Sequence, residues 1–298
     1  MTKTSLFLAL LLMWSVSFSQ VPHLPEPVSE HYKELQSLSV APNPERAWMD
    51  TIKYPPKEYG SSLLFVLVKP YYLSEKQIKI ICDGVKVPAN SSDQTRKELD
   101  YLLELQSRRT SQQKDRVEFL ANIGYWPQIN LLQSHDDFAQ NLTDLFFEGR
   151  EITGGWCTAK NFPHISRLLQ GIMQDMRIME FTVKYRFLRP RPYHLEPRLE
   201  PLARINSPSF ASGHTLWAFL QAYIWSEIIP GKRNNFIALA EEIRRSREIM
   251  GIHYPSDNEA SRQIAYKMLS NYFKNEKFKK DLTEAVKEWK AESKKFSQ

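Results

Sequence analysis

The sequence predicts an all-α fold, a helical bundle that carries one long proline-rich loop. Three observations predict it: several long segments have apolar residues at helical spacing, no long stretch alternates with period two, and no internal repeat is present. The strongest helical period lies in residues 163–188. Its apolar positions fall mostly three or four residues apart, at Ile165, Leu168, Leu169, Ile172, Met176, Met179 and Val183. We expect these side chains, the methionines included, to pack in a core.

The N-terminus has the layout of a secretory signal peptide over residues 1–19. Lys3 precedes an apolar run from Leu6 to Trp14, and small residues follow at Ser17 and Ser19. An uncleaved membrane anchor is the alternative, but the run is short for a membrane span. We therefore expect cleavage after Ser19, a periplasmic or secreted protein, and no stable membrane span in the mature chain.

Residues 20–90 are expected to form an irregular, proline-rich segment that packs on the core. Within it, the apolar run at 62–73 fits either a buried strand or a short helix. The helical domain is expected over residues 91–298. It begins with a helical pattern at 91–116, which Ser92 or Asp93 opens and which places Leu99, Leu102 and Leu103 on one side.

The rest of the domain is expected to alternate helices with the proline-rich loop. A short helix at 134–150 precedes the methionine-rich helix at 163–188, and the loop follows at 189–213. Four more helical patterns then occupy residues 214–230, 232–252, 256–273 and 278–295.

Charge and cysteine content narrow the classes of partner. The formal net charge of +6 suits anionic ligands, but lysine and arginine are scattered and no nucleic-acid-reading motif is present, so we expect no nucleic acid partner. No cluster of histidine and cysteine predicts a zinc site, and we expect no metal. Cys82 and Cys157 could form one disulfide in an exported chain or remain separate buried thiols. A homo-oligomer is also left open.

Three short segments contain residues that suit an oxyanion ligand: KYRFLRPRP (184–192), SPSFASGHT (207–215) and SREIMGIHYPSD (246–257). Each alone has an ordinary structural explanation, as a cationic helix end stopped by proline or as a serine helix cap. The middle segment also points to anion binding. A helix that begins near His214 offers unpaired backbone N–H groups, and Gly213 lets a ligand approach the backbone closely.

Taken together, the order and spacing of these segments resemble the tripartite signature of the type 2 phosphatidic acid phosphatase superfamily. The resemblance is strongest to the class A bacterial non-specific acid phosphatases, and the superfamily also contains membrane lipid phosphatases and vanadium haloperoxidases. It covers roughly ninety residues and includes every charged position of the signature. One departure is Ala211, which stands where the family usually has proline.

Hydrolysis of a phosphate monoester requires a site that gathers negative charge, attacks phosphorus and protonates the departing oxygen. The phosphate-binding residues are expected to be Lys184, Arg191, Ser212, Gly213 and Arg247. Two arginines suit bidentate contacts, while the lysine acts as a point charge.

The catalytic residues are expected to be His253, His214 and Asp257. The His253 imidazole would attack phosphorus and form a phosphohistidine, with Asp257 orienting its ring. His214 would act first as general acid and then as general base. The resemblance implies the same roles and no metal. We therefore expect an exported phosphomonoesterase for small phosphorylated substrates, with no cofactor.

The same oxyanion pocket also suits other functions. One is a vanadium-dependent haloperoxidase with vanadate as cofactor, although 298 residues is short for that class. A lipid or pyrophosphate phosphatase is another, and a helical module that merely binds phosphate is the non-enzymatic alternative. Near the motifs, Arg189 is expected to be a structural or rim charge, and Tyr193 and Trp217 are expected to pack in the core.

Overall fold

The computed structural model describes residues 30–53, 69–122 and 147–296. The predicted signal peptide, most of the apolar run at 62–73 and most of the short helix expected at 134–150 lie outside these ranges.

The described residues form helices joined by turns and loops, with no strand among them, so the all-α prediction is confirmed. The helices are α1 (Glu30–Gln36), α2 (Glu75–Asp83), α3 (Asp93–Ser107), α4 (Ser111–Asn122), α6 (Phe147–Thr153), α7 (Pro163–Phe187), α8 (Pro192–Leu195), α9 (Gly213–Ile228), α10 (Arg233–Ile249), α11 (Pro255–Tyr272) and α12 (Glu276–Glu292).

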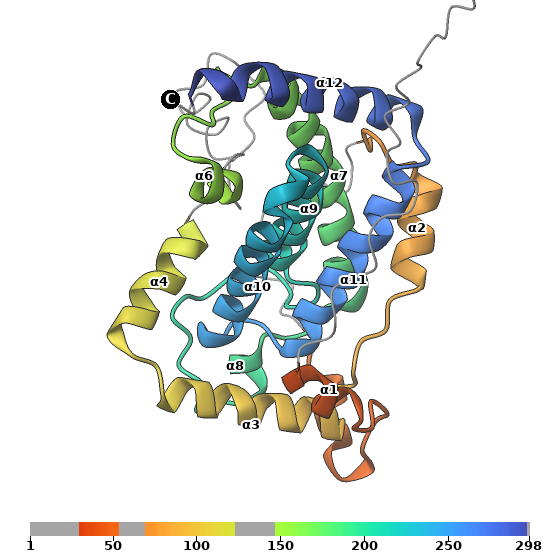
Figure 1. Ribbon diagram of the computed structural model, residues 1–298. Coiled ribbons are helices and arrows are strands. Elements are labelled where there is room, and N and C mark those ends of the chain that lie inside the picture. The colour runs from red at the N-terminus through yellow and green to blue at the C-terminus, as the bar shows by residue number, and fades with distance from the viewer. Residues whose placement is uncertain (1–29, 54–68, 123–146, 297–298) are drawn as a thin grey trace, which may run out of the picture.

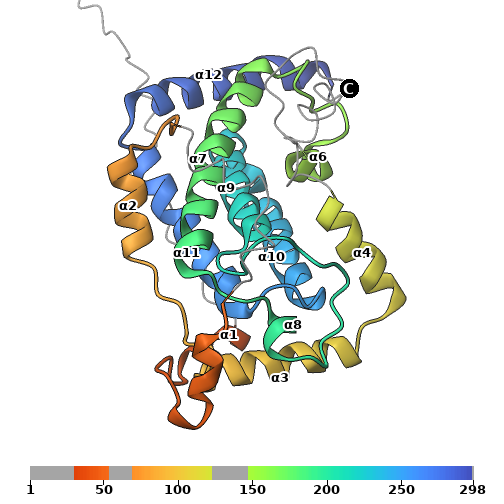
Figure 2. The same cartoon turned by 180° about the vertical axis from the view of Figure 1, so that it is seen from behind.

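The bundle is built around α9. All residues of this helix except His214 and Glu227 are buried, because α7, α10, α11 and α12 pack around it. Figures 1 and 2 show α12 crossing one end of the bundle, while α3 and α8 lie at the other end. A helix that is apolar on all sides requires such an enclosure, and this one carries a predicted site segment at its N-terminus.

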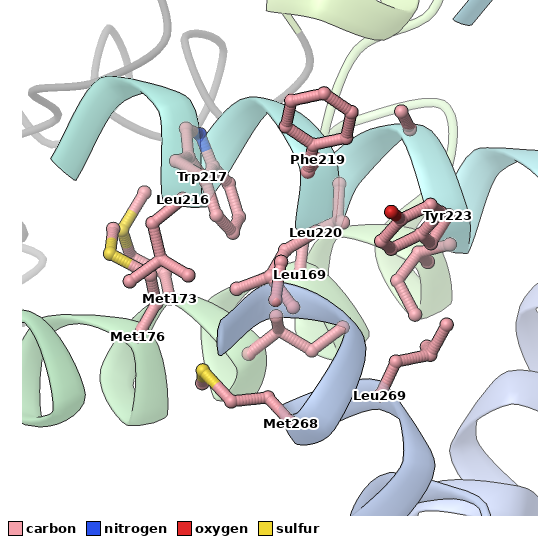
Figure 3. Packing of buried hydrophobic residues seen from close by; sticks show 14 of the residues in the cluster. Leu169, Met173, Met176, Leu216, Trp217, Phe219, Leu220, Tyr223, Met268 and Leu269 are labelled. Carbon is pink, nitrogen blue, oxygen red and sulfur yellow. The ribbon is translucent and has the colours of Figure 1, made fainter. Parts of the chain in front are cut away.

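Side chains from three helices interlock in the core (Figure 3). Leu169 and Met176 of α7 face Leu216 and Leu220 of α9, and Met268 of α11 closes the cluster. All of them are buried. The periodicity of residues 163–188 therefore predicted both the helix and its buried face.

The N-terminal part of the chain is more regular than predicted. Residues 20–90 contain α1, α2 and a 3₁₀ helix at Pro44–Thr51. Helix α2 begins with a capping box between Ser74 and Gln77 and buries Ile78 and Ile81. The apolar face of this helix is only about two turns long. Its periodicity was therefore too short to stand out in a segment that is otherwise rich in proline.

The helical pattern at 91–116 is divided between two helices. Ser92 caps α3 as predicted, but the helix ends at Ser107 and α4 begins at Ser111. Thr110 caps the start of α4. Its side chain accepts the Gln113 N–H, and its own N–H donates to the Gln113 side chain. Helix α4 therefore turns away from α3, as Figure 1 shows.

The two cysteines are separate thiols. Cys82 in α2 and Cys157 before α7 are both free and buried in the main core cluster. Burial raises the pKa of Cys157 to about 12, so this thiol stays protonated and unreactive. Of the two alternatives left open by the sequence, the structure therefore has buried thiols that behave as small apolar groups.

We expect Leu169→Ala to lower the free energy of unfolding by about 2–5 kcal/mol, because it leaves a cavity among α7, α9 and α11. The matched control is Ile80→Ala, since Ile80 is 59% exposed. That change should cost less than about 0.5 kcal/mol. Chemical denaturation of both variants checks this. Equal losses would contradict the assignment of α7 to the core.

Candidate active site

The three predicted segments meet at one end of the bundle and line a cavity of about 270 Å³. Five predicted residues line it: Lys184, Arg191, Gly213, His214 and His253. The remaining wall comes from Glu180, Phe181, Arg204, Ile205, Asn206, Ser207 and Ile252. The other predicted residues, Ser212, Arg247 and Asp257, are buried and are not part of the wall.

Helix ends deliver these side chains to the cavity. Lys184 lies in the last turn of α7, and Arg191 directly precedes α8. Helix α9 begins at Gly213, so its first backbone N–H groups lie at the cavity. Helix α10 ends at Ile249, and His253 lies in the link before α11. The turn of α10 therefore does not continue to Asp257, and a new helix supplies that carboxylate.

The hydrogen bonds of His253 define its protonation. Its Nδ1 lies 3.1 Å from Oδ2 of Asp257, and a carboxylate only accepts, so Nδ1 carries the proton. Its Nε2 lies 2.9 Å from Nη1 of Arg191, and a guanidinium only donates, so Nε2 is the acceptor. The ring is thus a neutral imidazole whose lone pair on Nε2 lies beside a cation.

Asp257 is enclosed by donors. Its Oδ1 accepts from Arg189 at 2.7 Å, while its Oδ2 accepts from the Ser209 hydroxyl, from His253 and from the Tyr254 N–H. Burial alone would raise the pKa of Asp257, but the Arg189 charge and the hydrogen bonds from His253 and Ser209 hold it below its ordinary value. The carboxylate is therefore charged, and it orients the ring of His253.

Arg191 and Lys184 are held by backbone carbonyls. Arg191 donates from Nε to the Ser207 carbonyl at 2.9 Å and from Nη1 to the Ile252 carbonyl at 2.9 Å. Lys184 donates to the Pro208 carbonyl at 2.7 Å. Each head group therefore stays at the cavity wall although it is almost completely buried.

His214 and Arg247 lie against α4. Nε2 of His214 is 3.1 Å from the carbonyl of Ala121, which only accepts, so this nitrogen carries a proton and Nδ1 is the one that titrates. Arg247 donates to the Val117 carbonyl at 3.2 Å and to the Ser246 hydroxyl. A helix that precedes all three motifs therefore forms part of their surroundings.

The cations make the site strongly electropositive. Burial and then the Arg191 charge lower the pKa of His253 well below its ordinary value, and Asp257 only partly offsets them. Burial and then the Arg247 charge lower the pKa of His214 well below its ordinary value. Burial and the Arg191 charge lower the pKa of Lys184 to about 7. A bound dianion would act against these shifts, because its negative charge favours the protonated form of each group.

Other predicted residues have structural roles. Ser212 caps α9, with its hydroxyl accepting the Thr215 N–H at 3.4 Å and donating to the Thr215 hydroxyl at 3.0 Å. Trp217 is fully buried in the core, as predicted. Tyr193 is buried in a second cluster, and its hydroxyl accepts the Ile205 N–H.

Sequence reasoning missed the seven further wall residues, and it also missed Glu98 and Ser209, which are buried behind the wall. Glu180 lies one helical turn before Lys184 and 3.8 Å from its ammonium, so the i, i+4 spacing was the available signal. Ser209 lies inside the second segment, SPSFASGHT, but nothing in that segment relates it to Asp257. Glu98 and Arg204 carry no spacing that relates them to the motifs.

Over residues 30–53, 69–122 and 147–296, no group of three or more histidine, cysteine, aspartate or glutamate side chains gathers in a form that could hold a metal ion. Within the same ranges, no helix has the length and apolarity needed to cross a bilayer.

Comparison with known proteins supports the resemblance predicted from the motifs. Residues 166–277 match the family model of the PAP2 superfamily, the abbreviated name of the superfamily identified above. A non-specific acid phosphatase from Providencia stuartii is 29% identical over 142 residues, which cover 44% of this chain and 56% of that relative. The chain therefore spans little more than half the length of this relative.

A solved structure is also similar. It is the first transmembrane PAP2-type phosphatidylglycerolphosphate phosphatase from Bacillus subtilis, with 17% sequence identity and a TM-score of 0.41. The alignment covers 66% of this chain and 92% of that chain.

We expect the protein to lose stability as the pH falls below about 6.5, the ordinary histidine pKa. The unfolded chain takes up protons there, whereas the folded chain keeps His253 and His214 neutral to lower pH. The unfolded state therefore binds more protons, and the free energy of unfolding falls by up to about 1.4 kcal/mol per pH unit for each histidine.

Denaturation curves of wild type and His253→Gln between pH 7 and 5 check this. The variant should show a shallower fall, whereas the control His164→Gln, whose side chain is exposed at the start of α7, should follow wild type. Equal slopes for wild type and His253→Gln would contradict the expected pKa shift.

Proposed function

Because residues 166–277 form a PAP2 superfamily domain, we propose that the protein is an exported phosphatase of the acid phosphatase type. It hydrolyses small phosphate monoesters through a phosphohistidine on His253, without a metal. The observation that carries the proposal is the Nε2 lone pair of His253 beside Arg191, in a cavity that Lys184 and His214 also line.

Substrate binding exchanges contacts within the site. The phosphoryl oxygens accept from Arg191, Lys184 and the first N–H groups of α9. Arg191 then donates to phosphate in place of His253, which releases the Nε2 lone pair for attack. Arg247 is buried behind His214, and its charge acts on the His214 ring. From there its positive charge stabilises the negative charge of the phosphoryl group.

The first chemical step transfers the phosphoryl group to His253. A bond forms between Nε2 and phosphorus, the bond between phosphorus and the ester oxygen breaks, and His214 donates a proton to that oxygen. The imidazole becomes positively charged, and Asp257 stabilises it through Nδ1–H. The bound dianion raises the pKa of His214, so that it can carry this proton.

The second step returns the enzyme to its starting state. His214, now neutral, takes a proton from water, the water oxygen bonds to phosphorus, and the bond between phosphorus and Nε2 breaks. Inorganic phosphate leaves and Arg191 returns to His253. The cavity of about 270 Å³ suits the phosphoryl group of a small ester, with the rest of the substrate lying outside it.

We expect His253→Ala to abolish turnover of p-nitrophenyl phosphate and all ³²P labelling, because the variant lacks the nucleophile. Rapid acid-free quenching and phosphohistidine analysis of wild type should locate the label on His253. The matched control is His164→Ala, which should label like wild type because this histidine is exposed and lies outside the cavity.

Three results would favour other functions. Halide oxidation with vanadate and peroxide, without phosphatase activity, would indicate a haloperoxidase. Hydrolysis confined to lipid phosphates would indicate a lipid phosphatase. Phosphate binding without turnover of any ester would indicate a binding module. Each of these would overturn the proposal.

We expect His214→Ala to accumulate phosphohistidine when p-nitrophenyl phosphate is the substrate. That leaving group departs without a proton, so phosphorylation proceeds, whereas activation of water fails and hydrolysis slows by about 10²–10⁴-fold. Quenched-flow measurement of the burst checks this. A variant that neither turns over nor accumulates the intermediate would show that His214 does not activate water.

A further inference from the structure

We propose that Glu98 and Arg189 are positioning residues that keep the negative charge of Asp257 available to His253. The inference rests on the proposed function and extends it to a helix outside the matched domain, since Glu98 belongs to α3. Neither residue lines the cavity.

The first observation is a continuous chain of buried contacts. Glu98 Oε2 accepts from Arg189 Nη2 at 3.3 Å, and Arg189 Nη1 donates to Asp257 Oδ1 at 2.7 Å. Asp257 Oδ2 then accepts from His253 Nδ1 at 3.1 Å. The side chains of both carboxylates have no exposed area, and that of Arg189 is 1% exposed. Such groups interact strongly because water does not screen them.

Arg189 has no freedom to move away from Asp257. Its guanidinium also donates to the Ser256 hydroxyl at 2.8 Å and to the Thr95 hydroxyl at 3.2 Å. It lies 3.8 Å from the centre of the Tyr254 ring, in a cation–π contact. These contacts fix the guanidinium, and the guanidinium in turn fixes the carboxylate of Asp257.

Glu98 also holds the helix that carries Asp257. Its Oε1 accepts the Ser256 N–H at 2.8 Å, and its Oε2 accepts the Ser256 hydroxyl at 2.9 Å. Ser256 is the second residue of α11, so this N–H is one of the unpaired donors at a helix start. Figure 1 shows α3 at the end of the bundle where α11 begins. A carboxylate at this position also has a favourable interaction with the helix dipole.

The charges explain why a second carboxylate is needed. Asp257 and Arg189 alone would be neutral as a pair, and would offer little to a positively charged imidazole. Glu98 offsets Arg189, so the three groups together carry one negative charge. That charge is matched when His253 becomes positive during phosphoryl transfer. Glu98 accepts from Arg189, from Ser256 twice and from Gln94. Burial raises the pKa of Glu98, while the Arg189 charge and the hydrogen bonds from Ser256 and Gln94 act in the opposite direction and favour the ionised form.

The test uses substitutions that change charge with little change of shape. Glu98→Gln leaves the Arg189 charge without its offset and should lower the pKa of His253. Arg189→Met removes the cation and should raise that pKa. The double variant should return it toward the wild-type value. NMR titration of the His253 ring in the full chain measures the pKa without depending on turnover.

Kinetics supply the second readout. We expect Glu98→Gln to lower kcat by roughly ten- to hundredfold, the effect that outer partners of histidine have at metal sites. Binding of inorganic phosphate should change by less than about threefold, since neither residue lines the cavity.

The matched control is Glu288→Gln. Glu288 of α12 also caps the start of a helix, accepting the His164 and Ile165 N–H groups of α7, but it is not bonded to Arg189. This variant should keep the wild-type kcat and His253 pKa.

Two results would overturn the inference. One is an unchanged His253 pKa in Glu98→Gln, and the other is a shift of the same sign in both single variants. Should Arg189→Met fail to fold, the sign of the Glu98→Gln shift decides alone. A wild type that forms no phosphohistidine would defeat the proposed function instead, and would leave the pKa measurement as a separate test of the positioning role.

Discussion

Compensation of buried cations at one end of an apolar bundle is the constraint on which the rest of the structure depends. The side chains of Lys184, Arg189, Arg191 and Arg247 are almost completely removed from water, and each requires acceptors at hydrogen-bond distance. Backbone carbonyls of Ser207, Pro208 and Ile252 supply many of them. The proline-rich loop is irregular for this reason: a helix would bond its own carbonyls internally, whereas an extended chain can turn them toward the cations.

The bundle serves this cluster by bringing helix ends together. The site takes the last turn of α7, the first turn of α9 and the link from α10 to α11, while the long apolar faces of these helices pack elsewhere. Stability and function are therefore divided along each helix. The same division explains the depressed pKa of His253 and His214, because burial and the nearby arginines, both consequences of the fold, act on these rings before any ligand binds.

The sequence predicted those features that depend on local pattern. Periodicity located α7 and its buried methionines, Ser92 and Ser212 were identified as possible helix starts, and the three motifs were expected to share one pocket. The structure places five of their predicted site residues on one cavity wall. Features that depend on tertiary packing could not be predicted. The break before α4 depends on Thr110 and Gln113, and Ser209 meets Asp257 only because the loop folds back. Nor did any spacing relate Glu98 to Arg189, since they lie 91 positions apart.

Helices α3 and α4 are the clearest case of this tertiary dependence, because they precede the motifs and yet define the protonation and charge around them. The Ala121 carbonyl at the end of α4 fixes which nitrogen of His214 holds a proton. The Val117 carbonyl holds Arg247, and Glu98 of α3 offsets Arg189. Under the proposed function, the motifs supply the reacting atoms, while the flanking helices determine the electrostatic state in which those atoms meet a substrate. A fragment limited to residues 166–277 would contain His214, His253 and Asp257 but would lack these partners. It would therefore differ from the full chain in protonation and charge as well as in stability.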